Sequence, residues 1–377
     1  MALNILATHV IKIGFCLILI SFMLACEPPS FNQKEYDWKI PKGFPKPLVP
    51  SDNPMSTAKV TLGKKLFFDA GLSFNQSTSC ASCHQPQFAF SEPQKTATGA
   101  SGQKHRRNTQ ALVNVAYNSN LTWAHSGLDQ IEQQLLIPMF SENPVELGIT
   151  GHESEVLQRF KSHSYSKLFE HAFDDDDDGA DFDKIVKALA SYVRSLTSFS
   201  SPFDEYAYQN NDAAISDAAK RGMELFFSEK LECFHCHGGF NFTQSSQHEN
   251  QRLDLQPFHN TGLYNIDNKG AYPVYDEGLI EATLNPHDMG KFRAPTLRNV
   301  EVSAPYMHDG SFETLEEVIE FYAAGGRTKG ISNPLKSPFL VGFELKSGQK
   351  QDLVTFLQSL TDREFLKLKV NDPLVSH

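Results

Sequence analysis

Two short stretches of the sequence place cysteine and histidine at the spacing of a metal or cofactor site. Residues 80–84 read CASCH and residues 233–237 read CFHCH, so a histidine directly follows each pair of cysteines. Three chemistries use such a pair: a structural zinc ion, a redox dithiol and a covalently attached haem. Zinc needs no histidine directly after the pair, and a redox dithiol of this type belongs to a βαβ unit, for which the strand pattern is absent.

Haem attachment uses all three residues of each motif. The two thiols add to the vinyl groups of the porphyrin, and the histidine that follows ligates the iron. We therefore predict two haem c groups, one held by Cys80, Cys83 and His84 and the other by Cys233, Cys236 and His237. We predict that His235, at a free position of the second motif, has no role as an iron ligand.

The elements around the two motifs are duplicated. LGKKLFF (62–68) and RGMELFF (221–227) predict an amphipathic helix before each motif, and ALVNV (111–115) and TLRNV (296–300) follow it. WAHSG (123–127) and YMHDG (306–310) come next, each ahead of another helix. Residues 182–199 have apolar side chains at helical spacing, and strand patterns are scarce throughout. The chain is thus predicted to be mainly α, built from two copies of one module.

The N-terminus and the composition indicate where the protein works. Residues 13–25 form an apolar run too short to span a membrane, which predicts a signal peptide over residues 1–26. The run ends in MLAC, so we predict export to the periplasmic face and a lipid anchor on Cys26. Residues 27–56 are proline-rich and predict an extended tether. A net charge of −11 speaks against nucleic acid as a partner.

Longer stretches of the chain resemble the bacterial di-haem cytochrome c peroxidase and MauG family. The resemblance covers residues 41–365 and rests on LFFDAGLSFNQSTSCASCH, RRNTQALVNVAYN, NPVELG, SPFDEY, CFHCHGG, FRAPTLRNV and APYMHDGSFETLEEVIEFY. It implies two tandem cytochrome c-like domains, each with one haem. The peroxidatic haem would belong to residues 57–205 and the electron-transfer haem to residues 206–365, followed by a tail at 366–377.

The resemblance also implies roles for individual residues. Glu146 matches the distal acid and base, Gln133 its hydrogen-bonding partner, and Trp123 the indole between the haems. A carboxylate above the iron can move a proton from the near to the far oxygen of hydrogen peroxide. The family's calcium site matches Asn108 and the carbonyl groups of Ser303 and Pro305.

The second axial ligands of the two irons distinguish members of this family. Ala100 stands where some members place a distal histidine, so we predict an open first haem and no ligand role for His105. For the second haem the family spacing leads to Tyr322, as in MauG-type members, with Met307 as the alternative.

Three functions fit this pattern. The first is a peroxidase that reduces hydrogen peroxide with electrons from a small redox protein, either a cytochrome c or a copper protein. The second is a MauG-like enzyme that oxidises a protein side chain, and the third is a non-catalytic di-haem lipoprotein that only transfers electrons. In the peroxidase branch the resemblance also points to a homodimer.

Overall fold

The protein is mainly helical, as predicted, in a computed structural model that describes residues 36–173, 179–252 and 256–368. The predicted signal peptide, Cys26 and the start of the tether lie outside these ranges. The described α-helices are α2 (Thr57–Phe67), α3 (Cys80–Cys83), α4 (Ile131–Phe140), α5 (Glu153–Arg159), α6 (His163–Phe173), α7 (Phe182–Arg194), α8 (Pro202–Tyr208), α9 (Asp217–Phe226), α10 (Phe234–His237), α11 (Ile280–Thr283), α12 (Leu315–Ala323) and α13 (Gln349–Gln358).

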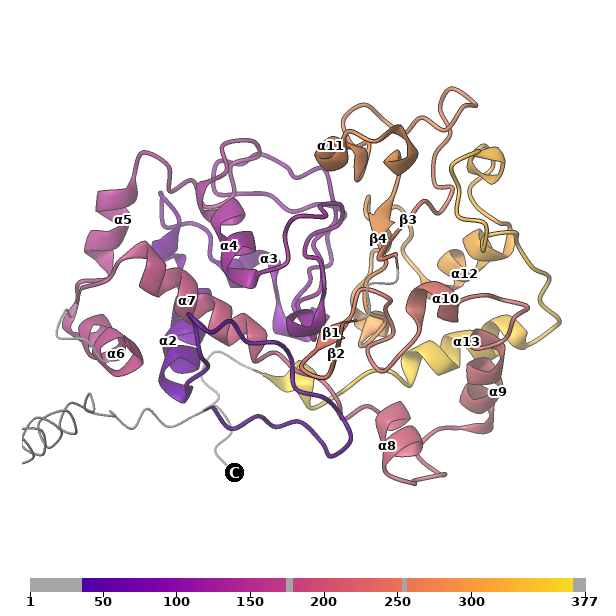
Figure 1. Ribbon diagram of the computed structural model, residues 1–377, viewed down its shortest axis with the longest axis horizontal. Coiled ribbons are helices and arrows are strands. Elements are labelled where there is room, and N and C mark those ends of the chain that lie inside the picture. The colour runs from indigo at the N-terminus through magenta and orange to yellow at the C-terminus, as the bar shows by residue number, and fades with distance from the viewer. Residues whose placement is uncertain (1–35, 174–178, 253–255, 369–377) are drawn as a thin grey trace, which may run out of the picture. The chain divides into compact units, whose positions relative to one another are not determined.

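The two haem motifs lie next to equivalent pairs of packed helices. Helix α2, which precedes the first motif in the chain, packs on α7. Helix α9, which precedes the second motif, packs on α13 (Figure 1). The glycines of the duplicated sequence, Gly63 and Gly222, lie at the contact points. A Cβ atom at Gly63 would collide with the carbonyl group of Ala188, and one at Gly222 with that of Asp352. Only glycine allows the backbones of these helices to approach so closely.

The asparagines of the duplicated L-x-N-V segments also play equivalent roles. Asn114 and Asn299 both adopt the left-handed backbone conformation, with φ of 53° and 59°. The side-chain oxygen of Asn114 accepts a hydrogen bond from the backbone N–H of Ser198, and that of Asn299 from the N–H of Asp362. Each asparagine therefore fixes the chain that leaves the last helix of its module. This explains why α7 ends at Arg194 although the apolar periodicity continues to residue 199.

Apolar side chains gather in three clusters. The first is built mainly from residues 55–196, the second from residues 203–360, and a smaller third cluster includes Ala124, Leu263, Tyr272 and Phe321. None of the helices in the described ranges is long and apolar enough to cross a membrane.

Four strands of two residues each are described. β1 (Gln247–His248) pairs with β2 (Gln251–Arg252), and β3 (Phe258–His259) pairs with β4 (Phe292–Arg293), both antiparallel. The β3–β4 pair matters for the second haem site, because it places His259 and Arg293 on the wall of one cavity.

Candidate haem sites

Each C-x-x-C-H motif folds as one helical turn with its histidine at the end. Cys80 and Cys83 bound α3, and His84 caps it; α10 ends at His237. The four cysteines of the motifs form no disulfide with one another, and burial raises the pKa of each thiol to about 12. Within the described ranges the only three metal-ligating side chains that converge are Glu229, Glu232 and His235. The two cysteine pairs therefore do not meet as a zinc site.

The two motif histidines are oriented in the same way. The Nδ1 atom of His84 lies 2.7 Å from the carbonyl oxygen of Phe90. That of His237 lies 3.3 Å from the carbonyl oxygen of Phe242 and 3.1 Å from that of Pro295. Burial lowers the pKa of both imidazoles, that of His237 to about 4, so both rings are neutral at pH 7. A neutral imidazole that donates from Nδ1 leaves Nε2 as the ligand atom, which suits an axial ligand of iron.

A cavity beside the second motif is lined by Cys233, Cys236 and His237, and polar atoms on its wall lack partners. Nη1 of Arg293, Nε2 of His259 and Nε2 of Gln110 are buried without a hydrogen bond. Burial lowers the pKa of Arg293 to about 10, so the guanidinium keeps its charge at neutral pH. Buried donors of this kind need an acceptor. The carboxylates of a haem would supply it, and the residues present fit that group.

The three polar residues had no assigned role in the sequence analysis. Arg293 lies in the FRAPTLRNV stretch. The one sequence signal for its role was that this basic residue directly precedes a segment expected to line the haem. In the chain, His259 lies 34 residues before Arg293, and Gln110 lies 183 residues before it. Only the tertiary structure brings them to one wall.

Glu146 lies near the first C-x-x-C-H motif. Its charge raises the pKa of both Cys80 and Cys83, which places its carboxylate near the attachment point. The carbonyl oxygen of Glu146 accepts a hydrogen bond of 2.7 Å from the N–H of Ala100, in the loop that follows the motif. Burial raises the pKa of Glu146 to about 7. A carboxyl group with this pKa can both accept and return a proton near neutral pH.

His105 lies beside Glu146. Its Nε2 atom is 3.8 Å from Oε1 of Glu146, and its side chain is 20% exposed. Burial lowers the pKa of His105, so this ring is neutral at pH 7. The sequence predicted only that His105 is not an iron ligand; the structure places it next to the predicted proton-transfer group.

Gln133 and its neighbour Gln134 differ in environment. Gln133, the predicted partner of Glu146, is exposed on α4. Gln134 is partly buried, and its side-chain oxygen is buried with no hydrogen-bond partner. Four residues further along α4, the carbonyl oxygen of Pro138 accepts a hydrogen bond from the N–H of Leu147, next to Glu146. Gln134 therefore lies one helical turn before the residue that contacts the segment carrying Glu146.

Trp123 and Asn108 lie on the wall of the cavity beside the second motif. The indole Nε1 of Trp123 donates a hydrogen bond of 2.7 Å to the carbonyl oxygen of Asn108. The Asn108 side chain donates to the carbonyl oxygens of Gln94 and Lys95 at 3.1 and 3.3 Å. Ser303 and Pro305, the other predicted calcium ligands, line the same cavity.

Both candidates for the second axial ligand reach this cavity. Tyr322 lies on α12 and Met307 in the preceding loop, where it adopts a left-handed φ of 70°. Burial raises the pKa of the Tyr322 phenol, and the charges of Cys236 and Cys233 raise it further. Tyr322 is therefore close to the attachment cysteines.

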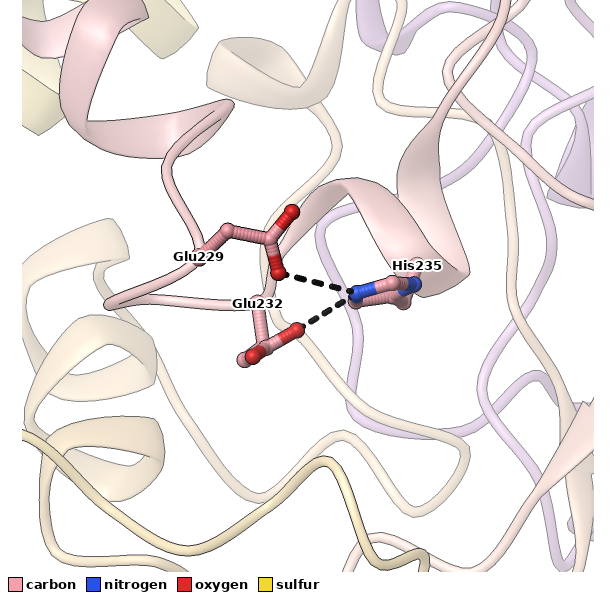
Figure 2. A group of neighbouring side chains, drawn as sticks. All are labelled: Glu229, Glu232 and His235. Atoms are coloured by element: carbon pink, nitrogen blue, oxygen red, sulfur yellow. Dashed lines mark ion pairs between the residues drawn. The ribbon is translucent and has the colours of Figure 1, made fainter.

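His235 contacts two glutamates and an aromatic ring. Its Nε2 atom lies 2.6 Å from Oε2 of Glu232 and 3.9 Å from Oε2 of Glu229 (Figure 2). Its ring stacks on Phe339, with ring centroids 4.4 Å apart. These contacts tie the second motif to the segment before it and to the distant loop that carries Phe339.

Together these features describe a mainly helical protein in which two C-x-x-C-H motifs have equivalent surroundings. The model of the di-haem cytochrome c peroxidase family matches residues 57–213. Cytochrome-c peroxidase IdrP1 of Pseudomonas sp. (strain SCT) is 35% identical over 333 residues, which cover 84% of this chain and 84% of that protein. The methylamine utilization protein MauG of Methylophilus methylotrophus is 32% identical over 362 residues, covering 95% of this chain and 97% of that protein.

A solved structure agrees with these relatives. The crystal structure of a MauG-like protein associated with microbial copper homeostasis has a TM-score of 0.85 and 41% sequence identity, covering 88% of this chain and 97% of that one. The chain belongs to the di-haem cytochrome c peroxidase and MauG family. It is an oxidoreductase of a family with two haem groups.

Proposed function

We propose that this enzyme reduces hydrogen peroxide to water at its first haem, with Glu146 as the proton-transfer group. The observation that supports this most directly is a carboxyl group with a pKa of about 7 beside Cys80 and Cys83. A haem held by Cys80, Cys83 and His84 would supply the electrons needed to cleave the O–O bond. Glu146 accepts the proton of the near oxygen and returns it to the far oxygen, which leaves as water.

Two neighbours of Glu146 support this role. Gln134 rather than Gln133 is proposed to hold the peroxide, because its amide oxygen is buried and lacks a partner. An amide accepts the hydrogen bond of an O–H group without taking its proton. His105, neutral and 3.8 Å from Glu146, leaves the carboxylate without a strong competing cation.

We also propose that electrons pass between the haems along residues 108–110 and Trp123. The backbone of Gln110 interacts with His84 of the first site, while its side-chain oxygen accepts a hydrogen bond of 2.7 Å from Arg293 of the second. The indole of Trp123 donates a hydrogen bond to the carbonyl oxygen of Asn108, which lies two residues before Gln110. This short segment thus touches both haem sites.

A second candidate function, a MauG-like oxidation of a protein side chain, is favoured by Tyr322. Burial alone keeps its phenol protonated, so a ligand role requires the positive charge of ferric iron to displace the proton. An anionic phenolate would lower the potential of that haem relative to a methionine ligand. The MauG-like relative of known structure supports this candidate through its similarity over 88% of this chain.

The remaining predictions complete the proposal. We propose export and a lipid anchor on Cys26, supported by the apolar run before MLAC. We propose that residues 57–205 and 206–365 are the two cytochrome c-like domains, supported by the equivalent helix pairs and asparagine contacts. A calcium ion between them is supported by the common cavity of Asn108, Ser303 and Pro305.

Steady-state turnover tests the main proposal. The reduced holoprotein should consume hydrogen peroxide and reoxidise a reduced cytochrome c or copper protein in a two-to-one ratio of donor to peroxide. No turnover with any small redox protein, together with covalent modification of a partner protein, would favour the MauG-like candidate. No reaction of either haem with peroxide would exclude both.

A further inference from the structure

Four tyrosines form a line from the second haem cavity to the surface. Tyr322 lines the cavity, and its phenol is close enough to that of Tyr272 for their charges to interact. The rings of Tyr272 and Tyr264 meet edge to face, with centroids 5.4 Å apart. The phenol of Tyr264 lies near that of Tyr275, a residue that is 63% exposed.

The line belongs to one packed cluster. Tyr264, Tyr272 and Tyr322 share the third apolar cluster with Trp123 and Phe321. His308, on the cavity wall, lies against the rings of Tyr272 and Tyr264. The centroid of its ring is 6.3 Å from that of Tyr272 and 6.5 Å from that of Tyr264. Ring separations of this size are those of direct aromatic contact, so the cavity is joined to Tyr264 without a gap.

The hydroxyl groups of the two central tyrosines differ in their acceptors. Tyr272 donates to the amide oxygen of Asn260 at 3.0 Å, and an amide does not take up a proton. Tyr264 donates to Oδ2 of Asp309 at 2.6 Å, the length of a charge-assisted hydrogen bond. The guanidinium group of Arg327 lies 5.5 Å from the centre of the Tyr264 ring. A positive neighbour disfavours a cationic ring, so oxidation of Tyr264 must be coupled to loss of its proton.

We infer that Tyr264, with Asp309 as its proton acceptor, is a redox-active residue through which oxidising equivalents leave the second haem site toward the surface. This inference rests on the proposed reaction with peroxide, which takes two electrons from the protein for each molecule reduced to water. In each step Tyr264 loses one electron to the haem site, its O–H bond breaks, and the proton forms an O–H bond to Asp309. An electron from an oxidisable side chain of a partner at Tyr275 restores Tyr264, and the proton returns from Asp309.

The test uses the diferric holoprotein, one equivalent of hydrogen peroxide and no electron donor. Freeze-quenched samples are examined by electron paramagnetic resonance, and ring-deuterated tyrosine separates a tyrosyl radical from a radical on Trp123. The wild-type protein should show a tyrosyl radical. The signal should be lost in Tyr264→Phe and in Asp309→Asn, which keeps a polar partner but removes the proton acceptor.

A matched control exists in the first module. Tyr165 also donates a short hydrogen bond to a carboxylate, Oδ2 of Asp69 at 2.5 Å, but it lies in the first apolar cluster. Tyr165→Phe should leave the radical unchanged. A full signal in correctly folded Tyr264→Phe or Asp309→Asn would overturn the inference, as would equal loss in Tyr165→Phe.

Optical spectra of the same samples separate this inference from the proposed function. If peroxide changes the haem spectrum in every variant but no tyrosyl radical forms even in the wild type, the relay is wrong and the reaction with peroxide stands. If peroxide changes no spectrum, the proposed function itself fails. Haem content and circular dichroism identify a misfolded variant, in which case the other substitution carries the test.

Discussion

Replacement of Glu146 by glutamine removes the proton acceptor from the first haem site and keeps the shape of the side chain. We expect Glu146→Gln to retain both haems and to react with peroxide at least about a hundredfold more slowly, the usual cost of losing a positioned acid or base. A hundredfold loss corresponds to about 2.7 kcal/mol of activation free energy. The nearby Glu142→Gln is the matched control, because Glu142 lies in the same loop and is exposed.

The pKa of Glu146 also predicts how the reaction depends on pH. Only the ionised carboxylate accepts a proton, so the rate should rise with pH and level off above a pKa of about 7. At pH 6 roughly a tenth of the carboxyl groups are ionised, against about half at pH 7, which predicts a rate about fivefold lower at pH 6. This pH dependence should be absent in Glu146→Gln.

The same pKa affects folding stability. The folded protein holds the Glu146 proton more tightly than the unfolded chain, so this residue destabilises the fold as pH rises from about 4.5 to about 7. The full change in pKa corresponds to about 3 kcal/mol. The carboxyl side chain is 32% exposed, so solvent screening reduces this to roughly 1–2 kcal/mol. Glu146→Gln should therefore be more stable than the wild type at pH 8, and equally stable at pH 4.

Stopped-flow mixing of the reduced holoprotein with peroxide, monitored by the haem spectrum from pH 5 to pH 9, measures the rate. Chemical denaturation at pH 4 and pH 8 measures stability. An unchanged rate in Glu146→Gln would refute the assignment, and a slow Glu142→Gln would then move the role to Glu142. A slow Glu146→Gln that keeps the wild-type pH profile would show that another group titrates.

Three further changes have defined outcomes. The ferric protein as isolated should contain a high-spin haem, in the wild type and in His105→Ala alike; a purely low-spin wild type that becomes high-spin in His105→Ala would show that His105 ligates the iron. Tyr322→Phe should raise the potential of the second haem in redox titrations, because an anionic ligand is lost, whereas a drop in potential confined to Met307→Leu would assign methionine. Arg293→Met should lower the holoprotein's free energy of unfolding by about 1.5–3 kcal/mol, the value of hydrogen bonds to a charged group. The exposed Arg221→Met, which breaks an ion pair with Asp352, should cost less than about 1 kcal/mol, and equal losses would contradict the role of Arg293.

The sequence alone predicted the attachment residues of both haems, the mainly helical fold and the duplication. These depend on local patterns: the C-x-x-C-H spacing, the helical period of residues 182–194, and the recurrence of glycine and asparagine at matching places. Gly63 and Gly222 illustrate why such patterns are readable, because each is fixed by one close helix contact that no other residue tolerates.

The tertiary structure decided which side chains share a site. In the structure the amide oxygen of Gln134 is buried and Gln133 is exposed, because the orientation of α4 about its axis determines which side chain points inward. The tertiary structure also brought His105 to Glu146, and it joined Gln110, His259 and Arg293 on one wall through the β3–β4 pair. No local periodicity encodes such contacts, since they arise between residues far apart in the chain only after the helices have packed.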